Sequence, residues 1–451
     1  MSILEFEENK LEENLHIDIN KKKKYGEVFT PFSLINQMFN MMDNKLFTNK
    51  NNTFLDMGAG TGNFSICLFW KLKKTLEQEI PDLKEREKHI IQRMIFMSEL
   101  QRENVDKLKN IFGLEANIIY GDYLTYDNLK FDVILGNPPY NSEGIKKVPS
   151  NEKDNKLNDG KTIWPEFIKH SINLLKLDGE IITIIPSIWM KPDKKKMYNF
   201  ITNYKIKKLR CFTNTETNKI FYKNAQTPTS ILYLKKCNND YKVSIFDKDI
   251  NDYINYEYSN NEPLPVYGAS VLSKIKTTNN LKYVIKTNCP SKKIKFSNIK
   301  SVNYPYKNIK TCILSGLKPK LIIEYSNQQL INYNKKKLIL AHKMYGFPFL
   351  DINDNYGVSK RDNYIILSDN ENELIKIKEF LSTKTALYLF ECTRYRMKYL
   401  EKYIFELIPD INKVKNFPEI INDATIAEFY HFTEKEINAI QNLHKKNYSF
   451  Y

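Results

Sequence analysis

Residues 54–63 read Phe-Leu-Asp-Met-Gly-Ala-Gly-Thr-Gly-Asn, and this stretch decides the fold. A short apolar run precedes glycines at positions 58, 60 and 62, and residues 63–72 then have the apolar spacing of a helix. Glycines allow a tight turn and bring backbone N–H groups close to a ligand, while the helix N-terminus behind them favours negative groups. Taken alone, this stretch predicts a ligand-binding turn. A nucleotide-binding loop of some other class, or a tight turn that binds nothing, is the alternative.

The alternation of strand and helix continues to about residue 236. Strands that alternate with helices predict an α/β fold with a parallel, doubly wound sheet, whose ligands bind at the carboxyl ends of the strands. The G-x-G-x-G spacing of Gly58 to Gly62, preceded by the acid Asp56, favours a cofactor with an amino-acid part over a pyrophosphate. Beyond residues 54–57, apolar runs predict strands at 94–97, 118–120, 131–135, 180–185 and 230–234, and an amphipathic pattern predicts a helix at 164–177.

Two acidic residues stand at predicted strand ends. An acid at the position of Glu99 can accept hydrogen bonds from both hydroxyls of a ribose, and a carboxylate at the position of Asp122 can accept one from an adenine amine. The gap from Gly58 to Glu99 is about twice the ~20 residues usual in such folds, and the charged stretch 73–92 explains it as an inserted helix. An ordinary strand-end acid is the alternative for Glu99.

Asn137-Pro138-Pro139-Tyr140, after the fourth strand, is the most specific motif. Two consecutive prolines fix the backbone there. The amide oxygen of Asn137 and the carbonyl oxygen of Pro138 can then accept two hydrogen bonds from one NH₂ group, which withdraws the nitrogen lone pair from ring conjugation and makes it nucleophilic. Tyr140 offers a flat face for a stacked base. The polar residues 141–162 that follow are typical of a substrate-gating loop.

In this order, the motifs resemble the amino-group DNA methyltransferases of the adenine-N6 type. The resemblance covers about residues 25–236, where Gly26 to Pro31 is similar to the family's N-terminal motif, Asp56 to Gly62 to its glycine-rich motif, and Asn137 to Tyr140 to its catalytic motif. It implies a class I S-adenosylmethionine-dependent methyltransferase fold, which is Rossmann-like and doubly wound, followed by a C-terminal α+β domain for DNA recognition. S-adenosyl-L-methionine is the implied cofactor, and double-stranded DNA is the implied substrate.

The resemblance also implies the role of each site residue. Adenine N6 is buried in a duplex, so the base must flip out, and it would stack on Tyr140 with a second aromatic residue nearby. Phe221 is similar to that aromatic residue of the family, and its neighbour Tyr222 is the rival. The implied catalytic residues are Asn137, Pro138, Pro139, Tyr140 and Phe221. The implied cofactor-binding residues are Phe29, Thr30 and Pro31 for the methionine part, Asp56, Gly58, Gly60 and Gly62 in the glycine-rich motif, and Glu99 and Asp122 for the ribose and adenine.

Most of the formal net charge of +16 lies in one part of the 451-residue chain. Residues 281–345 contain 14 Lys and one Glu, with no Asp or Arg, and so contribute +13. Because Lys neutralises phosphates, this stretch predicts a polyanionic partner, although a solvated basic face is the alternative for any single Lys. Arg394 and Arg396 are candidates to read base edges, or helix-surface residues. We expect a leader at 1–24, a methyltransferase domain at 25–240 and a target-recognition domain at 241–451.

Several kinds of site and location are disfavoured. The six cysteines are scattered without a Cys-x-x-Cys pair, so we expect neither a metal site nor a disulfide framework. Residues 1–24 lack the apolar stretch of a signal peptide, and the longest apolar run, Ile181–Met190, is too short to span a bilayer. We therefore expect an intracellular protein without a membrane segment, and we take it to be a monomer.

Other substrates and classes of protein stay open as alternatives. Similar motifs occur in enzymes that methylate RNA or a protein glutamine. The basic C-terminal half favours a nucleic acid over glutamine, whereas DNA over RNA rests on the resemblance. A nuclease fusion is another alternative, for which the 24 residues before the first motif leave no room at the N-terminus. A DNA-binding module without catalysis is disfavoured by the intact Asn137–Tyr140 motif. A separate restriction endonuclease is the expected partner if the enzyme belongs to a restriction-modification system.

Overall fold

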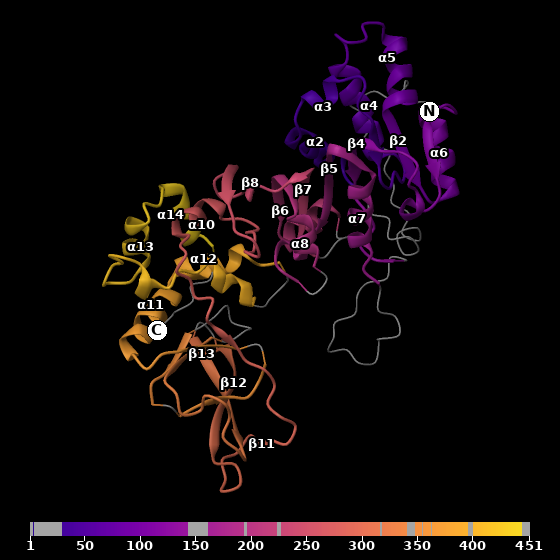
Figure 1. Cartoon of the computed structure of the whole chain (residues 1–451). Coiled ribbons are helices and arrows are strands. Elements are labelled where there is room, and N and C mark those ends of the chain that lie inside the picture. The colour runs from indigo at the N-terminus through magenta and orange to yellow at the C-terminus, as the bar shows by residue number, and fades with distance from the viewer. Residues whose placement is uncertain are drawn as a thin grey trace. The chain divides into compact units, whose positions relative to one another are not determined.

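The chain divides into two compact units (Figure 1). The first contains residues 1–189 and 195–244, and the second contains residues 190–194 and 245–451. The division at 244/245 falls shortly after the predicted domain boundary at 240/241, and the functional domain limits stay a prediction. The computed structural model describes residue 3 and residues 29–142, 161–193, 196–222, 227–315, 318–340, 348–353, 355–361, 363–395 and 400–443, so all of the predicted leader except Ile3 lies outside the described residues.

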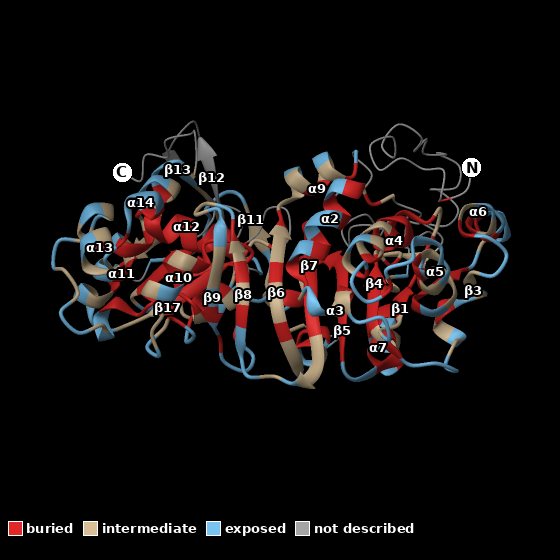
Figure 2. Ribbon diagram, turned by 90° about the horizontal axis from the view of Figure 1, so that it is seen from above, coloured by how far each residue is buried: buried red, intermediate tan, exposed pale blue. Residues whose placement is uncertain are grey.

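A mixed β-sheet forms the centre of the first unit. The strands that lie wholly in this unit have the order β3-β2-β1-β4-β5-β7-β6, and the sheet continues from β6 to β8 and β9. Strands β1 to β5 run parallel, whereas β7 runs antiparallel to its two neighbours, β5 and β6. Strands β1, β4, β5 and β7 are mostly buried (Figure 2), as expected where helices cover both faces of a sheet. The strands are β1 (Phe54–Asp56), β2 (Ile95–Glu99), β3 (Asn117–Tyr120), β4 (Phe131–Gly136), β5 (Leu175–Pro186), β6 (Tyr204–Phe212) and β7 (Thr229–Asn238).

Helices connect these strands. The glycine-rich turn leads into α4 through Gly62, whose φ of 98° lies in the left-handed region that favours glycine. The charged insertion predicted before Glu99 consists of α5 and a π-helical turn, η3, and it lengthens the connection while β1 and β2 stay adjacent. The elements are α2 (Phe32–Met41), α3 (Lys45–Thr48), α4 (Asn63–Thr75), α5 (Leu83–His89), η3 (Ile90–Met94), α6 (Arg102–Phe112), η4 (Tyr123–Thr125), α7 (Trp164–Leu174), η7 (Ser187–Met190), α8 (Met197–Ile201) and α9 (Asn214–Ile220).

The strand order reverses between β1 and β4. From β1 the chain moves outward to β2 and β3, and it then returns to β4 and β5 on the other side of β1. The carboxyl ends of β1 and β4 therefore frame a crevice at a topological switch point, where open α/β sheets bind their ligands. The predicted doubly wound α/β fold is confirmed in this unit.

The second unit combines mainly antiparallel sheets with helices. One sheet has the order β10-β17-β14-β15, and another has the order β11-β13-β12-β16. This composition confirms the predicted α+β character of the C-terminal part, whose role in DNA recognition stays a prediction. The elements are β8 (Lys242–Asp247), which spans the division, β9 (Asp252–Glu257), α10 (Ala269–Ile275), β10 (Ile285–Lys286), β11 (Phe296–Ser297), β12 (Tyr306–Ser315), β13 (Lys318–Ser326), β14 (Lys337–Leu340), β15 (Pro348–Asp351), β16 (Gly357–Val358), β17 (Tyr364–Leu367), α11 (Glu371–Leu381), α12 (Lys384–Cys392), η8 (Lys402–Glu406), η9 (Ile411–Lys413), α13 (Asp423–Phe429) and α14 (Glu434–Gln441).

Three observations on the described residues concern membrane helices, metal sites and cysteines. None of their helices is both long and apolar enough to pass through a membrane. Within the same ranges, no group of three or more His, Cys, Asp and Glu side chains is placed to hold a metal ion. The cysteines at positions 67, 211, 237, 289 and 392 are free thiols.

Candidate cofactor and catalytic site

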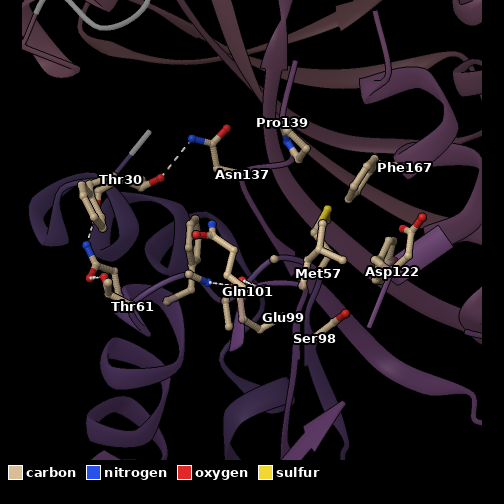
Figure 3. Close-up of a pocket in the computed structure, with 18 of the residues that line it drawn as sticks. Thr30, Met57, Thr61, Ser98, Glu99, Gln101, Asp122, Asn137, Pro139 and Phe167 are labelled. Carbon is tan, nitrogen blue, oxygen red and sulfur yellow. Dashed lines mark hydrogen bonds between the residues drawn. The ribbon is translucent and has the colours of Figure 1, made fainter. Parts of the chain in front are cut away.

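A pocket opens at the carboxyl ends of β1, β2, β3 and β4 (Figure 3). Its walls come from the glycine-rich turn, from the residues that follow each of these strands, from the segment before α2 and from α7. Parallel strands place all their carboxyl ends at one edge of the sheet, so residues far apart in the sequence meet here. The predicted site residues that line the pocket are Phe29, Thr30, Gly58, Gly60, Glu99, Asp122, Asn137 and Pro139. Those that do not line it are Pro31, Asp56, Gly62, Pro138, Tyr140 and Phe221.

Glu99 fastens the glycine-rich turn to the end of β2. One carboxylate oxygen, Oε2, accepts a hydrogen bond from the backbone N–H of Gly60 at 2.7 Å, and the other, Oε1, accepts one from the N–H of Gln101 at 2.7 Å. The Glu99 side chain is buried at the base of the pocket. Each carboxylate oxygen has a second lone pair, so this residue can hold the turn and also accept bonds from a ligand's hydroxyls.

Asp122 lies at another side of the pocket, beside an aromatic wall. Its Oδ1 accepts a hydrogen bond from Leu124 N–H at 3.0 Å, which caps the short helix η4, and the residue is exposed. The rings of Tyr123 and Phe167 stack with centroids 5.3 Å apart and an interplanar angle of 14°. Both line the pocket. This side of the pocket therefore combines aromatic rings with a carboxylate, which suits a flat ring with a polar edge.

Asn137 presents an amide oxygen without a partner. Its Nδ2 donates a hydrogen bond to Thr30 Oγ1 at 3.2 Å, whereas its Oδ1 is buried and has no hydrogen-bond partner among the described residues. Leaving a buried acceptor unsatisfied costs about 1–3 kcal/mol. Such an atom in a pocket indicates that a ligand supplies the missing donor.

The backbone around Asn137 is set by close packing. Gly136, with φ of 143°, ends β4 beside Met57, and a Cβ at this position would lie 2.8 Å from Met57 Cγ. Only glycine fits there, which brings the end of β4 against the glycine-rich turn. Pro138 is buried, and Tyr140 is half-buried with a hydroxyl that has no partner among the described residues. Burial raises the pKa of Tyr140 well above its usual value.

Directly after the motif, residues 140–142 and 161–163 are joined by backbone hydrogen bonds, and we call these two paired segments the neck. Backbone hydrogen bonds join Ile163 N–H to Tyr140 O at 3.1 Å and Ser142 N–H to Lys161 O at 2.8 Å. Most of the predicted gating loop, residues 143–160, lies outside the described residues. The neck holds the Tyr140 backbone beside the start of α7, the helix that carries Phe167.

The predicted residues outside the pocket have positions that shape it. Asp56 is buried beneath the glycine-rich turn, where its carboxylate accepts bonds from Ser65 Oγ at 2.9 Å and from Gly58 N–H at 3.4 Å. Gly62 and Pro31 are the N-caps of α4 and α2. The first part of the N-terminal motif, residues 26–28, lies outside the described residues.

The predicted base-stacking residue, Phe221, is not at the pocket. It follows the last residue of α9 and is only 1% exposed, because its apolar ring packs in the core. The rival residue, Tyr222, is 72% exposed and has a φ of 48°. The ring that projects into solvent at this helix end is therefore that of Tyr222.

Several pocket residues were not predicted from the sequence. Phe167 lies on the apolar face of α7, and that pattern is typical of a core residue. Leu100 had a weak signal, since it is an apolar residue directly after a polar strand end and is 58% exposed. Asn63 begins α4 and donates from Nδ2 to the backbone oxygen of Thr30 at 3.0 Å, a contact between segments that are far apart in the sequence.

Comparison with known proteins identifies the part of the chain that contains this pocket. Residues 34–221 match the model of the Eco57I restriction-modification methylase family. The matched residues include the glycine-rich turn, Glu99, Asp122 and the Asn137–Tyr140 motif, whereas Phe29 to Pro31 precede them.

Individual relatives match parts of the chain. The type II restriction enzyme and methyltransferase RM.Eco57I of Escherichia coli is 30% identical over 200 residues, which are 40% of this chain and 19% of that protein. The type II methyltransferase M.AccI of Acinetobacter calcoaceticus is 28% identical over 262 residues, which are 53% and 44%. A tRNA1(Val) (adenine(37)-N6)-methyltransferase of Bacteroides fragilis is 24% identical over 136 residues, which are 29% and 51%. The chain thus spans about half or less of the length of each relative.

Proposed function

We propose that this protein transfers a methyl group from S-adenosyl-L-methionine to the N6 amine of adenine in double-stranded DNA. The observation that carries the proposal is the buried Oδ1 of Asn137, which has no partner among the described residues, on a residue that lines the same pocket as the glycine-rich turn and Glu99. The match to the methylase family and the type II relatives support methyl transfer to DNA. A separate restriction endonuclease is the partner that we propose on the same basis.

The pocket residues fit the proposed cofactor. Glu99 would accept hydrogen bonds from the ribose hydroxyls, and Asp122 would accept one from the adenine amine. The rings of Tyr123 and Phe167 would pack beside the adenine. Phe29 and the backbone of Thr30 would contact the methionine part, near the backbone of Gly58 and Gly60, while the Thr30 hydroxyl binds Asn137. When bound, the cofactor supplies an electrophilic methyl group on its sulfonium.

Asn137 would act on the amine that receives the methyl group. Its Oδ1 would accept a hydrogen bond from adenine N6, and we assign a second acceptor to the carbonyl oxygen of Pro138. Two bonds to one NH₂ group would turn its lone pair toward the methyl group, so the rate enhancement comes from positioning and preorganised dipoles. Tyr140 and the exposed Tyr222 are our candidates to stack on the flipped base.

RNA is the second candidate substrate, because one relative is a tRNA adenine-N6 methyltransferase. The basic stretch 281–345 suits either nucleic acid. A protein glutamine has less support, because glutamine recognition does not call for such a stretch.

The decisive experiment expresses wild type, Asn137→Ala and Asn128→Ala in a host that lacks adenine methylation. Asn128 is an exposed residue outside the pocket and serves as the matched control. Sequencing of the host DNA should find N6-methyladenine in one short motif for wild type and Asn128→Ala, and none for Asn137→Ala. Unmarked DNA from a wild type that binds the cofactor would overturn the DNA assignment, and methylation of host tRNA would then be measured. Full methylation by Asn137→Ala would overturn the catalytic assignment.

A further inference from the structure

Thr30 connects two walls of the pocket through its own hydrogen bonds. Its backbone oxygen accepts from Asn63 Nδ2 at 3.0 Å, and its hydroxyl oxygen accepts from Asn137 Nδ2 at 3.2 Å (Figure 3). Thr30 is only 3% exposed, although it belongs to the segment before α2 and not to the sheet. The residue therefore occupies a fixed position between the start of α4 and the end of β4.

The amide of Asn137 has one described restraint on its rotation. The last torsion of an asparagine side chain is broad and roughly two-fold, so packing alone orients an amide weakly. The bond from Nδ2 to Thr30 is the hydrogen bond that its side chain makes within the described residues. With Nδ2 held there, the amide turns Oδ1 away from Thr30 (Figure 3), and Oδ1 is the buried atom that has no partner among the described residues.

We propose that Thr30 is a positioning residue that orients the Asn137 amide for methyl transfer. Its hydroxyl binds Nδ2 and thereby keeps Oδ1 directed at the amine to be methylated, while Asn63 fixes the Thr30 backbone. This inference rests on the proposed function, because it concerns the same amide. It differs from a contact between Thr30 and the cofactor, which would act on cofactor affinity instead of on the chemical step.

The experiment compares Thr30→Val, Thr30→Ser and the control Thr48→Val. Valine has nearly the shape of threonine without the hydroxyl, serine keeps the hydroxyl, and Thr48 lies in α3 outside the pocket. We expect Thr30→Val to lower kcat roughly tenfold, the worth of one hydrogen bond, with the Kd for S-adenosylmethionine changed by less than about twofold. Thr30→Ser should recover most of the lost kcat, and Thr48→Val should behave like wild type.

A second readout does not depend on methyl transfer. In protein labelled with ¹⁵N-asparagine, the side-chain NH₂ signals of Asn137 are assigned by their absence in Asn137→Ala. They should shift in Thr30→Val, return in Thr30→Ser and stay in place in Thr48→Val. Unmoved signals, or a kcat equal to that of wild type, would overturn the role of Thr30.

Other outcomes separate the competing explanations. A raised Kd with unchanged kcat would assign Thr30 to the cofactor. A lowered Tm in both Thr30 variants, without recovery of kcat in Thr30→Ser, would make its role structural. Both outcomes contradict the proposal. A wild type that methylates no DNA overturns the proposed function, while the NMR shift still decides whether Thr30 holds the amide.

Discussion

Asp56 shows how one buried residue can make the folding stability depend on pH. Burial is the largest cause of a rise in the pKa of this carboxyl group from 3.8 to about 7; the nearby Glu99 carboxylate contributes to the rise, and the hydrogen bonds from Ser65 and Gly58 oppose it. The folded protein therefore keeps a proton at pH values where the unfolded chain has released it. Folding stability from this group is present below about pH 4 and is lost as the pH rises to about 7.

Asp56→Asn, which imitates the protonated acid, should remove this pH dependence. Between about pH 4 and 7 the unfolding free energy of wild type should fall relative to that of the variant by on the order of 4 kcal/mol. Urea denaturation at several pH values measures the difference. Asp127→Asn, at an exposed position, is the control and should follow wild type. Equal slopes for wild type and Asp56→Asn would mean that Asp56 is charged throughout this range.

At the scale of a single element, the end of α9 separates a structural aromatic residue from an accessible one. Phe221→Ala should destabilise the protein by about 3–5 kcal/mol, because it leaves a cavity where the ring was buried. Tyr222→Ala should change stability by less than about 0.5 kcal/mol. If Tyr222 stacks on the flipped base, this variant should bind it roughly 10- to 100-fold more weakly.

The two effects are measured separately. Urea denaturation gives the stability of each variant, and the fluorescence of 2-aminopurine at the target adenine reports the flipped base. Tyr241→Ala is the matched control, because Tyr241 is also exposed and has a φ of 56°. A loss of the flipped-base signal in Tyr241→Ala as well would remove the special role of Tyr222.

The strand ends were predictable from the sequence, whereas the contacts between distant elements were not. Gly58, Glu99, Asp122 and Asn137 each follow an apolar run, so their meeting at one sheet edge follows from the parallel arrangement. The bond between Thr30 and Asn137 spans 107 positions and leaves no local pattern. Periodicity and propensity describe neighbours along the chain, so such contacts lie beyond their reach.

Strand β6 was missed for a related reason. Residues 204–212 carry Lys205, Lys207 and Lys208, and a strand so rich in charge is not expected inside a sheet. Lys207 is accommodated because its ammonium group binds Glu180 Oε1 at 2.9 Å and also pairs with Asp43, both from distant segments. Burial of the charge is offset only in the folded chain, where these carboxylates come close.

At the scale of the whole molecule, the basic stretch 281–345 is less available than its composition predicted. Lys337 is fully buried in an ion pair with Asp351 at 2.7 Å, and Lys310 and Lys336 pair with Glu324 and Glu371 at 3.0 and 3.5 Å. These three lysines therefore pair with carboxylates within the second unit. The exposed lysines in the described part of this stretch are Lys282, Lys286, Lys292, Lys293, Lys295, Lys300, Lys320 and Lys335.

The exposed group at 292–295 provides the test of DNA binding by this unit. If Lys292, Lys293 and Lys295 contact phosphates, their joint replacement by Ala should weaken DNA binding. The negative slope of log K against log salt should become less steep by about 2–3, since each contact contributes about 0.9. Cofactor affinity should not change, because the pocket lies in the other unit. Lys84, Lys88 and Lys107, exposed in the first unit, allow a control with the same loss of charge. Titration of a labelled duplex at several salt concentrations gives both slopes. Equal losses in the two triple variants would mean that net charge, and not a binding face on the second unit, attracts DNA.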